Sequence, residues 1–242
     1  MEQGQHMDDF EKQDKLKEFY DSGDYYSSRK ENFADRASRF NRNMVKNVLA
    51  IYCASKKEKA LDVGCGWGNI SLALQKRGVD VTGLDYSEES VRICRESAKN
   101  LGLNPEKFVC RDAANTGFEP SSFDAIYCAD LVEHVFPEVY LSMIQEFHRI
   151  LKRGGKLVIY TPDPHHIFEI MRKHNIILKK DEGHVDFKTR PAIELSLRNN
   201  GFSISRAYFV ESHVPIMNIL ERALKQFVPF LRRRVAVLAI KD

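Results

Sequence analysis

Apolar residues change their spacing along this chain near residue 57. Before that point they recur at helical intervals with no long β-branched run, as at Ala37, Phe40, Met44 and Val48, and this predicts two or three helices. After it, short apolar runs alternate with longer amphipathic stretches. Such alternation is typical of a largely parallel β-sheet with helices on both faces.

The short apolar runs predict seven strands, and the amphipathic stretches between them predict four helices. The predicted strands are Ala60–Val63, Val79–Leu84, Lys107–Cys110, Phe123–Ala129, Lys156–Thr161, Phe202–Val210 and Val235–Lys241. The predicted helices are Asn69–Arg77, Ser87–Asn100, Pro137–Leu151 and Pro191–Asn200. The acids after Ser87 fit a helix start, and the basic residues and glycines of Lys152–Gly155 are expected to close the preceding helix.

Composition leaves this fold class in place and excludes others. The chain has 242 residues, of which 43% are apolar and 29% charged, and this argues against disordered, collagen-like or coiled-coil proteins. A net charge of +3 gives no support for a nucleic-acid partner. The apolar runs are far shorter than the about twenty residues of a spanning helix, and the N-terminus lacks a signal pattern, so a cytoplasmic location is expected. Five cysteines without a CxxC pair indicate reduced thiols rather than zinc ribbons or thioredoxin-like redox centres.

Three glycines at alternate positions, Gly64, Gly66 and Gly68, follow the first predicted strand and precede a helix. A turn of this kind lets the backbone approach a ligand closely. In the dinucleotide fingerprint Gly-x-Gly-x-x-Gly, the third glycine comes one residue later, where this chain has Asn69. The turn therefore does not favour NAD or FAD.

Acidic residues lie at the ends of three consecutive predicted strands. Asp62 precedes the glycine turn, where it would repel a pyrophosphate and attract an ammonium group. Asp85 ends the second strand, 23 residues after Asp62, where a carboxylate can accept hydrogen bonds from both hydroxyls of a ribose. Asp112 follows the third strand and could meet an adenine amino group. Together they predict an adenosine-type cofactor whose amino-acid end fits S-adenosylmethionine (SAM).

The sequence resembles the class I SAM-dependent methyltransferases, particularly the branch of ubiquinone-biosynthesis O-methyltransferases, over about residues 45–210. The motifs that carry this resemblance are Asp62–Gly68, Gly83–Ser87, Asp112–Ala113, Phe123–Tyr127, Leu131–Val135 and Leu151–Gly155. The resemblance implies an α/β, Rossmann-like, doubly wound sheet of seven mostly parallel strands with an antiparallel last strand. It also implies a helical N-terminal cover over residues 1–56 and a methyltransferase domain over 57–242, as one structural domain overall. The expected cofactor contacts are Asp62, Gly64, Gly66, Gly68, Asp85, Tyr86, Asp112, Ala113, Asp130 and Leu131.

Methyl transfer from a sulfonium is an in-line displacement, so the protein mainly supplies alignment and an acceptor in its reactive protonation state. A hydroxyl acceptor needs a base, or a metal ion that lowers its pKa. Glu133 and His134, after the fourth strand, and His184 are the expected catalytic residues. Further candidates after the fifth strand are Asp163, His165 and His166.

In some relatives, including terminal RNA 2′-O-methyltransferases, a Glu-x-x-Glu-His stretch holds a divalent cation. The corresponding positions here are Asp130, Glu133 and His134, and His184 resembles a further ligand of the RNA enzymes. A divalent cation at these four residues is therefore a candidate second cofactor. The alternative is a site without a metal, in which His134 or His184 acts as the base or contacts the substrate.

The leading hypothesis is methyl transfer from SAM to a hydroxyl of a small or lipid-like molecule. The alternatives are an N-methyltransferase acting on an amino sugar or small amine, an RNA 2′-O-methyltransferase, and a SAM-binding protein without catalysis. A basic, apolar segment over residues 219–234 predicts peripheral membrane contact; the alternative is a helix packed on the sheet with solvated arginines. Tyr25, Tyr26 and Trp67 are expected either in the ligand pocket or in the core. The sequence names neither the acceptor, which the cover and the loop of residues 162–190 select, nor the oligomeric state.

Overall fold

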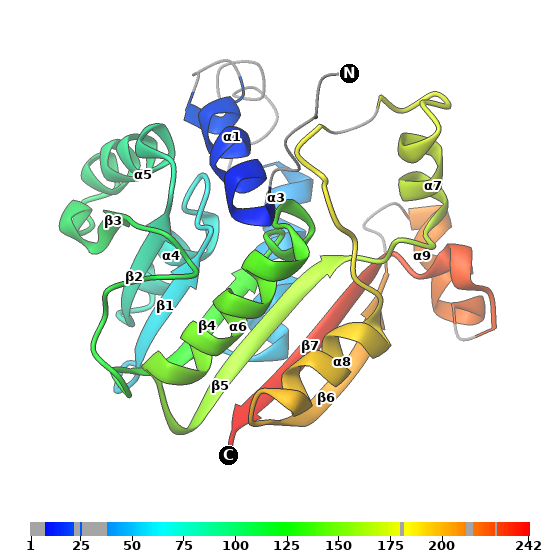
Figure 1. The fold of residues 1–242 in the computed structure, drawn as a ribbon. Helices are drawn as coiled ribbons and strands as arrows, with labels where there is room; N and C mark the ends of the chain where they lie inside the picture. The colour runs from blue at the N-terminus through cyan, green and yellow to red at the C-terminus, as the bar shows by residue number, and fades with distance from the viewer. Residues whose placement is uncertain (1–7, 22–24, 26–37, 180–181, 212–214, 226) are drawn as a thin grey trace, which may run out of the picture.

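A computed structural model describes residues 8–21, 25, 38–179, 182–211, 215–225 and 227–242. Its centre is one seven-stranded sheet with the strand order β3-β2-β1-β4-β5-β7-β6 (Figure 1). The strands are β1 (Lys59–Val63), β2 (Asp80–Asp85), β3 (Phe108–Cys110), β4 (Phe123–Ala129), β5 (Leu151–Pro162), β6 (Phe202–Val210) and β7 (Arg234–Lys241). Only β7 runs antiparallel to its neighbours β5 and β6. The predicted fold class and the seven predicted strands are confirmed.

Helices connect these strands. The α-helices are α1 (Asp9–Asp21), α3 (Arg39–Ile51), α4 (Asn69–Lys76), α5 (Glu88–Asn100), α6 (Pro137–Ile150), α7 (Ile167–Lys173), α8 (Arg190–Asn199) and α9 (Pro215–Leu224). Short 3₁₀ turns are η1 (Pro105–Lys107), η2 (Val132–His134) and η3 (Pro229–Leu231). The four predicted helices are confirmed. Tyr26 and most of the segment that joins α1 to α3 lie outside the described residues, so only part of the expected cover can be compared.

Three boundaries differ from the sequence prediction. Lys152–Gly155 do not form a loop after a helix, because α6 ends at Ile150 and β5 begins at the next residue, where buried Leu151 pairs with β4. The expected loop of residues 162–190 contains α7. The segment 219–234 is not one helix, since α9 ends at Leu224 and Pro229 opens a separate 3₁₀ turn; proline lacks the N–H that would continue a helix.

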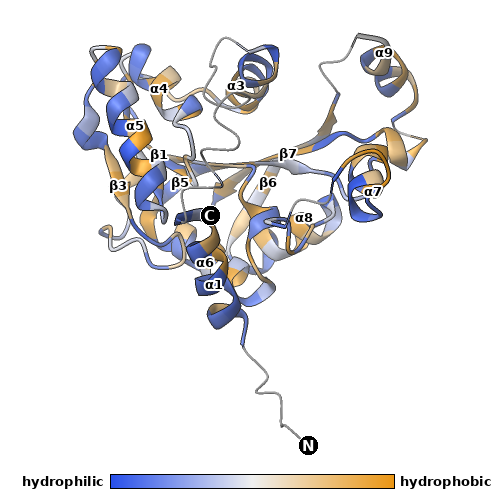
Figure 2. Ribbon diagram, turned by 90° about the horizontal axis from the view of Figure 1, so that it is seen from above, coloured by the Kyte–Doolittle hydropathy of each residue, from blue (hydrophilic) through white to orange (hydrophobic). Residues whose placement is uncertain are grey.

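Both faces of the sheet are buried, which is why its strands have nearly continuous apolar runs. On one face, Leu61 and Ile126 pack in a cluster with residues of α6 and α8 such as Phe147 and Leu197. On the other face, residues of the same strands pack against α3 and α4. Figure 2 shows these two helix layers on opposite sides of the sheet. Within the described part of the chain, no helix has the length and apolarity needed to cross a membrane.

The strand order reverses between β1 and β4, so their connections leave the sheet in opposite directions and open a crevice at its carboxyl edge. The first residues of β7 reach the same edge, because Arg234 pairs with Pro162 at the end of β5. Helix α1 covers this edge through Gln13, which donates from its side-chain amide to the His134 carbonyl and accepts from the Phe136 N–H. The fold therefore gathers the ends of six strands and one covering helix around this crevice.

Candidate functional site

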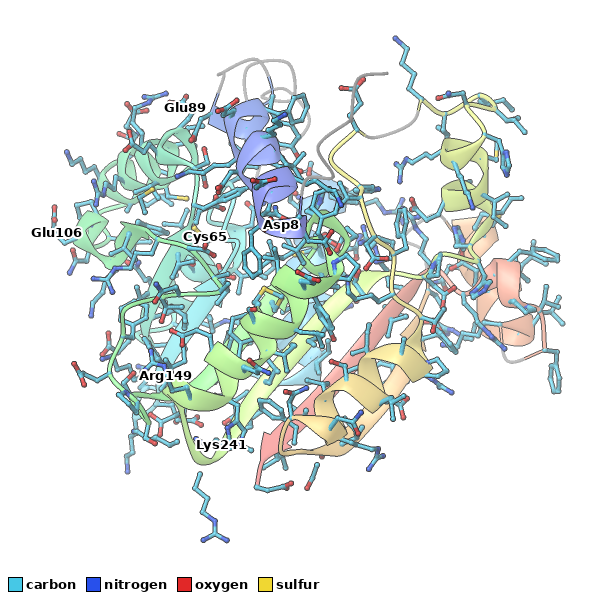
Figure 3. The ribbon with its side chains drawn as sticks, viewed as in Figure 1. Asp8, Cys65, Glu89, Glu106, Arg149 and Lys241 are labelled. Atoms are coloured by element: carbon cyan, nitrogen blue, oxygen red, sulfur yellow. The ribbon has the colours of Figure 1, made fainter. Side chains whose placement is uncertain are left out.

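The crevice holds a cavity of about 730 Å³. Its walls come from helices α1, α3, α4, α6 and α7, the turn η2, the glycine turn, and the ends of β1, β2, β3, β4, β5 and β7. Figure 3 shows the side chains around it, with Cys65 of the glycine turn labelled. Most of the predicted site residues line this cavity: Asp62, Gly64, Gly66, Asp85, Tyr86, Asp112, Ala113, Asp130, Leu131, Glu133, His134 and His184. Gly68 is the predicted contact that does not.

The glycine turn uses its residues in two ways. Gly66 has a φ of +51° and donates its N–H to Oδ2 of Asp85 at 2.8 Å. A Cβ placed on Gly66 would meet no atom closer than 4.0 Å, so the turn leaves room for a ligand there. At Gly68, by contrast, φ is +72° and a Cβ would lie 2.9 Å from the sulfur of Cys94. Gly68 therefore serves the packing of the turn on α5.

Two of the three predicted acids are buried. Asp62 is only 2% exposed, and its Oδ2 accepts from the Ser71 N–H at 3.0 Å and the Ser71 hydroxyl at 2.5 Å. Burial, with a smaller effect of the Asp85 charge, raises the pKa of Asp62 to about 7. Asp85 accepts from the N–H groups of Gly66 and Ser87, and burial raises its pKa as well. Each Asp85 oxygen accepts one backbone N–H, and a hydrogen bond from the Ser90 side chain acts to lower the pKa of the same carboxyl. A carboxylate oxygen can accept more than one hydrogen bond, so a ligand hydroxyl can also bind here.

Aromatic side chains surround the acidic end of the cavity. Tyr20 and Tyr25 pack edge to face with ring centroids 4.5 Å apart, and Tyr20 lies 5.8 Å from the ring of Tyr86. Tyr25 and the buried Trp67 both line the cavity. Tyr25 and Trp67 are therefore pocket residues. Tyr26 lies outside the described residues.

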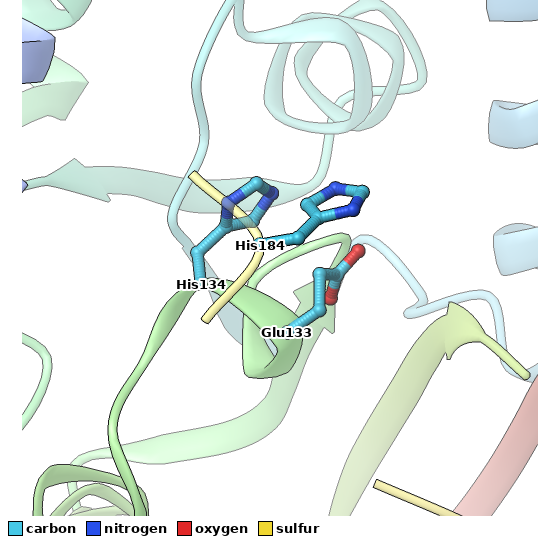
Figure 4. A group of neighbouring side chains, drawn as sticks. All are labelled: Glu133, His134 and His184. Atoms are coloured by element: carbon cyan, nitrogen blue, oxygen red, sulfur yellow. The ribbon is translucent and has the colours of Figure 1, made fainter. Parts of the chain in front are cut away.

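Glu133, His134 and His184 come together beside this region. One ligand-type atom from each lies within 4.8 Å of those of the other two, and Figure 4 shows the three side chains gathered at one point. Glu133 is 1% exposed and accepts a hydrogen bond from the Thr161 hydroxyl at 2.9 Å. Burial raises the pKa of Glu133 to about 8, and the nearby Asp130 charge acts in the same direction. At neutral pH this carboxyl is therefore mainly protonated.

Gly183 and Tyr20 orient the His134 ring. Nδ1 of His134 lies 2.8 Å from the Gly183 carbonyl and 2.7 Å from the Tyr20 hydroxyl. In the tautomer that carries its proton on Nδ1, this nitrogen donates to the Gly183 carbonyl, because a carbonyl only accepts, and the lone pair lies on Nε2. A histidine in this state can accept a proton or bind a metal ion through Nε2.

His184 reaches the site because its chain segment is attached to η2. The N–H groups of Val185 and Asp186 donate to the Glu133 carbonyl at 2.9 and 3.3 Å. The rings of His134 and His184 then lie 4.7 Å apart. These contacts join residues fifty positions apart in the sequence into one site.

The other candidate residues lie outside the group of Glu133, His134 and His184. Asp130, with a φ of +53°, forms an ion pair with Arg234 and is not part of the three-residue group. Asp163 accepts from His165, and His166 contacts Glu221 in a pair with no exposed side-chain surface. Neither pair lines the cavity.

The sequence analysis missed the cavity-lining residues Tyr20, Glu169, Arg172, Arg233 and Arg234. A signal existed for two of them, because the segment 219–234 ends in three arginines. The interpretation with solvated arginines was wrong for Arg233 and Arg234, and the membrane interpretation did not place these two residues in a cavity wall. Arg233 is buried against Glu169, and Arg234 pairs with Asp130 inside the cavity wall.

The chain is similar to known methyltransferases in sequence and in fold. Residues 60–155 match the family described as Methyltransferase domain. The chain is 39% identical over 106 residues to a Coxiella burnetii protein named ubiquinone biosynthesis O-methyltransferase, covering 44% of each chain. It is 29% identical over 136 residues to the protein of that name from Pseudomonas aeruginosa, covering 54% of this chain and 57% of the relative. The chain therefore spans about half the length of the curated relatives it matches.

Solved structures extend the likeness of fold over nearly the whole chain. Magnesium protoporphyrin IX methyltransferase from Synechocystis, with SAH (S-adenosylhomocysteine) bound, superposes with a TM-score of 0.69 at 20% identity and covers 97% of this chain and all of its own. A SAM-dependent methyltransferase from Archaeoglobus fulgidus has the same TM-score at 17% identity, with 90% and 100% covered.

Proposed function

We propose that this chain, a member of the class I SAM-dependent methyltransferases, transfers the methyl group of SAM to a hydroxyl of a small or lipid-like molecule. One observation carries the choice of a hydroxyl acceptor. His134, whose Nδ1 lies 2.8 Å from the Gly183 carbonyl oxygen, lies with His184 and Glu133 in the wall of the cavity that the glycine turn enters. An amine acceptor needs only to be neutral, whereas a hydroxyl must lose a proton during attack.

The acidic end of the cavity supplies the groups that would hold SAM. Asp85 would accept hydrogen bonds from the ribose hydroxyls, and Asp62 would pair with the ammonium group. SAM supplies a methyl group on a sulfonium; the acceptor oxygen forms the new O–C bond as the S–C bond breaks, and SAH leaves. Nε2 of His134, or the His184 ring, would take the hydroxyl proton.

We further propose that Glu133, His134 and His184 can hold a divalent cation. Two imidazoles and one carboxylate suit the first-row transition metals. The carboxyl has no cation of its own within the trio, so a bound metal ion would favour its ionised form. The bound ion would lower the pKa of the acceptor hydroxyl.

Substitution of the two histidines tests the choice of acceptor. His134→Ala and His184→Ala are each expected to lower kcat for a catechol probe by about 100-fold or more, the usual range for loss of a general base. His174→Ala, at the exposed end of α7, is the matched control. SAH binding, measured by calorimetry, should be unchanged in all three. Full activity in both variants would overturn the proposed role.

Four further measurements separate the alternatives. Chelator treatment that lowers activity, with recovery on adding Mn²⁺, Mg²⁺ or Zn²⁺, would support the cation; unchanged activity would exclude it. Methylated product from amines but not from hydroxyl probes would favour an N-methyltransferase. Salt-dependent RNA binding would favour an RNA enzyme, and SAH binding without turnover on any acceptor would favour a protein without catalysis.

The surface around α9 supports a lipid-like acceptor. Ile219, Phe227 and Phe230 are 70%, 81% and 51% exposed, and Arg222 lies on the same segment. Apolar side chains next to cations are typical of a peripheral membrane surface. We expect sedimentation with phosphatidylglycerol vesicles, weakened by Phe227→Ser together with Phe230→Ser; equal sedimentation of both proteins would contradict this surface.

A further inference from the structure

The cavity has two ends of opposite chemical character. Asp85 lies at the end of β2, and Arg234 at the start of β7. Four strand spacings separate β2 from β7 in the sheet, or roughly 19 Å at the usual distance between neighbouring strands. Glu133, His134 and His184 come from η2, after β4, and from the segment attached to it. The groups proposed to act on the acceptor therefore lie between the cofactor end and the arginine end.

The ion pairs described at the arginine end give three guanidinium groups two carboxylate partners. Glu169 accepts from Arg172 at 3.0 Å and from Arg233 at 3.1 Å, so one carboxylate serves two guanidinium groups. Arg234 pairs with Asp130. Among the described charged residues that line this end, three arginines thus share two carboxylate partners, Glu169 and Asp130, while the Glu133 carboxyl accepts from the Thr161 hydroxyl.

The neighbouring acids outside the cavity wall are engaged elsewhere. Asp163 accepts from the N–H and the ring of His165. Glu211 pairs with Lys225 at 2.7 Å. Asp163 and Glu211 are therefore not the ion-pair partners of these three arginines.

Burial raises the free-energy cost of a guanidinium group that shares its carboxylate partner. The Arg233 side chain is 10% exposed, and a cation removed from water needs an anion close by. Burial and the Arg234 charge lower the pKa of Arg233 to about 10. A guanidinium group presents a planar set of donors that matches a carboxylate or a phosphate.

We propose that Arg172 and Arg233 form a subsite for an anionic group, a carboxylate or a phosphate, that the acceptor carries near the hydroxyl to be methylated. The inference rests on the proposed function and specifies its substrate class as a hydroxylated acid. His184 and Glu169 line the same cavity, so the subsite and the groups proposed to take the hydroxyl proton face one space. The acid group would anchor the acceptor at one end while its hydroxyl faces the cofactor.

The test compares two probes that differ in charge and little in shape, 3,4-dihydroxybenzoate and 3,4-dihydroxybenzamide. Their binding to the SAH-saturated protein is measured by calorimetry. The wild type is expected to bind the benzoate about tenfold more tightly, since one hydrogen bond to a charged group is worth about 1.5 kcal/mol or more. 4-Hydroxyphenyl phosphate, compared with hydroquinone, distinguishes phosphate from carboxylate.

The variants are Arg172→Gln, whose side chain is one-third exposed and whose loss the fold should tolerate, and Arg233→Gln. Each should abolish the preference for the benzoate. Arg198→Gln, at an exposed position of α8, should retain it. An equal affinity of the wild type for both probes, no binding of either, or a preference kept in both variants would overturn the subsite.

Independent readouts separate this inference from the proposed function. Methylation of a neutral catechol with no preference for acids would refute the subsite and leave the methyltransferase intact. Arginine-dependent binding of the acid without methylation of any hydroxyl would support the subsite and refute the proposed methyl transfer. SAH affinity should be the same in all variants, because the arginines lie at the far end of the cavity from Asp85.

Discussion

The protonation of Asp62 affects the stability of the fold, and we expect it to affect the affinity for the proposed cofactor. The Asp62 pKa of about 7, caused mainly by burial, lies above its ordinary value of 3.8. The folded protein thus binds a proton that the unfolded chain releases, and without ligand its stability falls as pH rises from about 4 to 7. An ammonium group brought beside Asp62 would favour the ionised form of its carboxyl. The affinity for the proposed cofactor should therefore rise as pH rises.

We therefore predict that the affinity for SAH rises about tenfold between about pH 6 and pH 7.5, the range in which Asp62 ionises in the ligand-free protein. Calorimetric titration at several pH values measures this change. Asp62→Asn should bind SAH more weakly and with a flat pH profile. The same rise in the variant would assign the effect to another group.

Sequence reasoning recovered the residues that a linear motif specifies. The glycine turn and the acids after it line the cavity because each directly follows a strand, and strand ends meet at one edge of the sheet. Gly68 departs from the expectation because its neighbour Cys94 belongs to α5, a contact that no spacing encodes. Arg233 and Arg234 were misread because solvent and a cavity both fit an arginine next to an apolar run. Only the pairing of β7 with β5 decides between them.

At the scale of elements, Lys188 connects the segment that carries His184 to η2. Its ammonium group is buried and donates to the Val132 carbonyl at 3.0 Å and to the Asp186 carboxylate at 2.9 Å. It also lies 4.4 Å from the centre of the Tyr140 ring. These contacts hold the two pieces of the proposed proton-accepting site together.

We predict that Lys188→Met lowers the free energy of unfolding by about 1–3 kcal/mol, because buried carbonyl oxygens lose their donor. It should also lower kcat at least tenfold while SAH affinity stays the same, since Lys188 does not line the cofactor end. Chemical denaturation and kinetics with a catechol probe measure these effects. Lys99→Met, at an exposed position of α5, is the control and should change neither quantity. A loss of stability with kcat unchanged would make Lys188 structural only.

The elements themselves were largely predictable from their period. Strands with nearly continuous apolar runs and amphipathic helices alternate clearly in the sequence, and the structure confirms them. The boundaries that failed depend on partners distant in sequence. Leu151 is extended because it pairs with Phe123, and α7 forms in an expected loop where Glu169 meets Arg233, the residue before β7. The helix and strand propensities of the local sequence contain no information about either partner.

At the scale of the whole molecule, ligand binding should stabilise the fold, because the proposed cofactor residues lie on separate strands of one sheet. Asp62 belongs to β1 and Asp85 to β2, while Asp112 follows β3. A ligand that contacts all three binds only when these strands are assembled. At a concentration 100 times its Kd, such a ligand adds about 2.7 kcal/mol, or about 5–10 °C in melting temperature for a domain of this size.

We predict a shift of this size with SAH and none with NAD, whose fingerprint the glycine turn does not match. Melting followed by far-ultraviolet circular dichroism measures the shift without a reporter dye. Asp85→Ala should abolish the SAH shift while it still unfolds cooperatively, because Asp85 is the proposed partner of the ribose hydroxyls. His174→Ala, outside the cavity, should keep the full shift. Stabilisation by NAD but not by SAH would contradict the cofactor assignment, and with it the proposed roles of Asp62, Asp85 and His134.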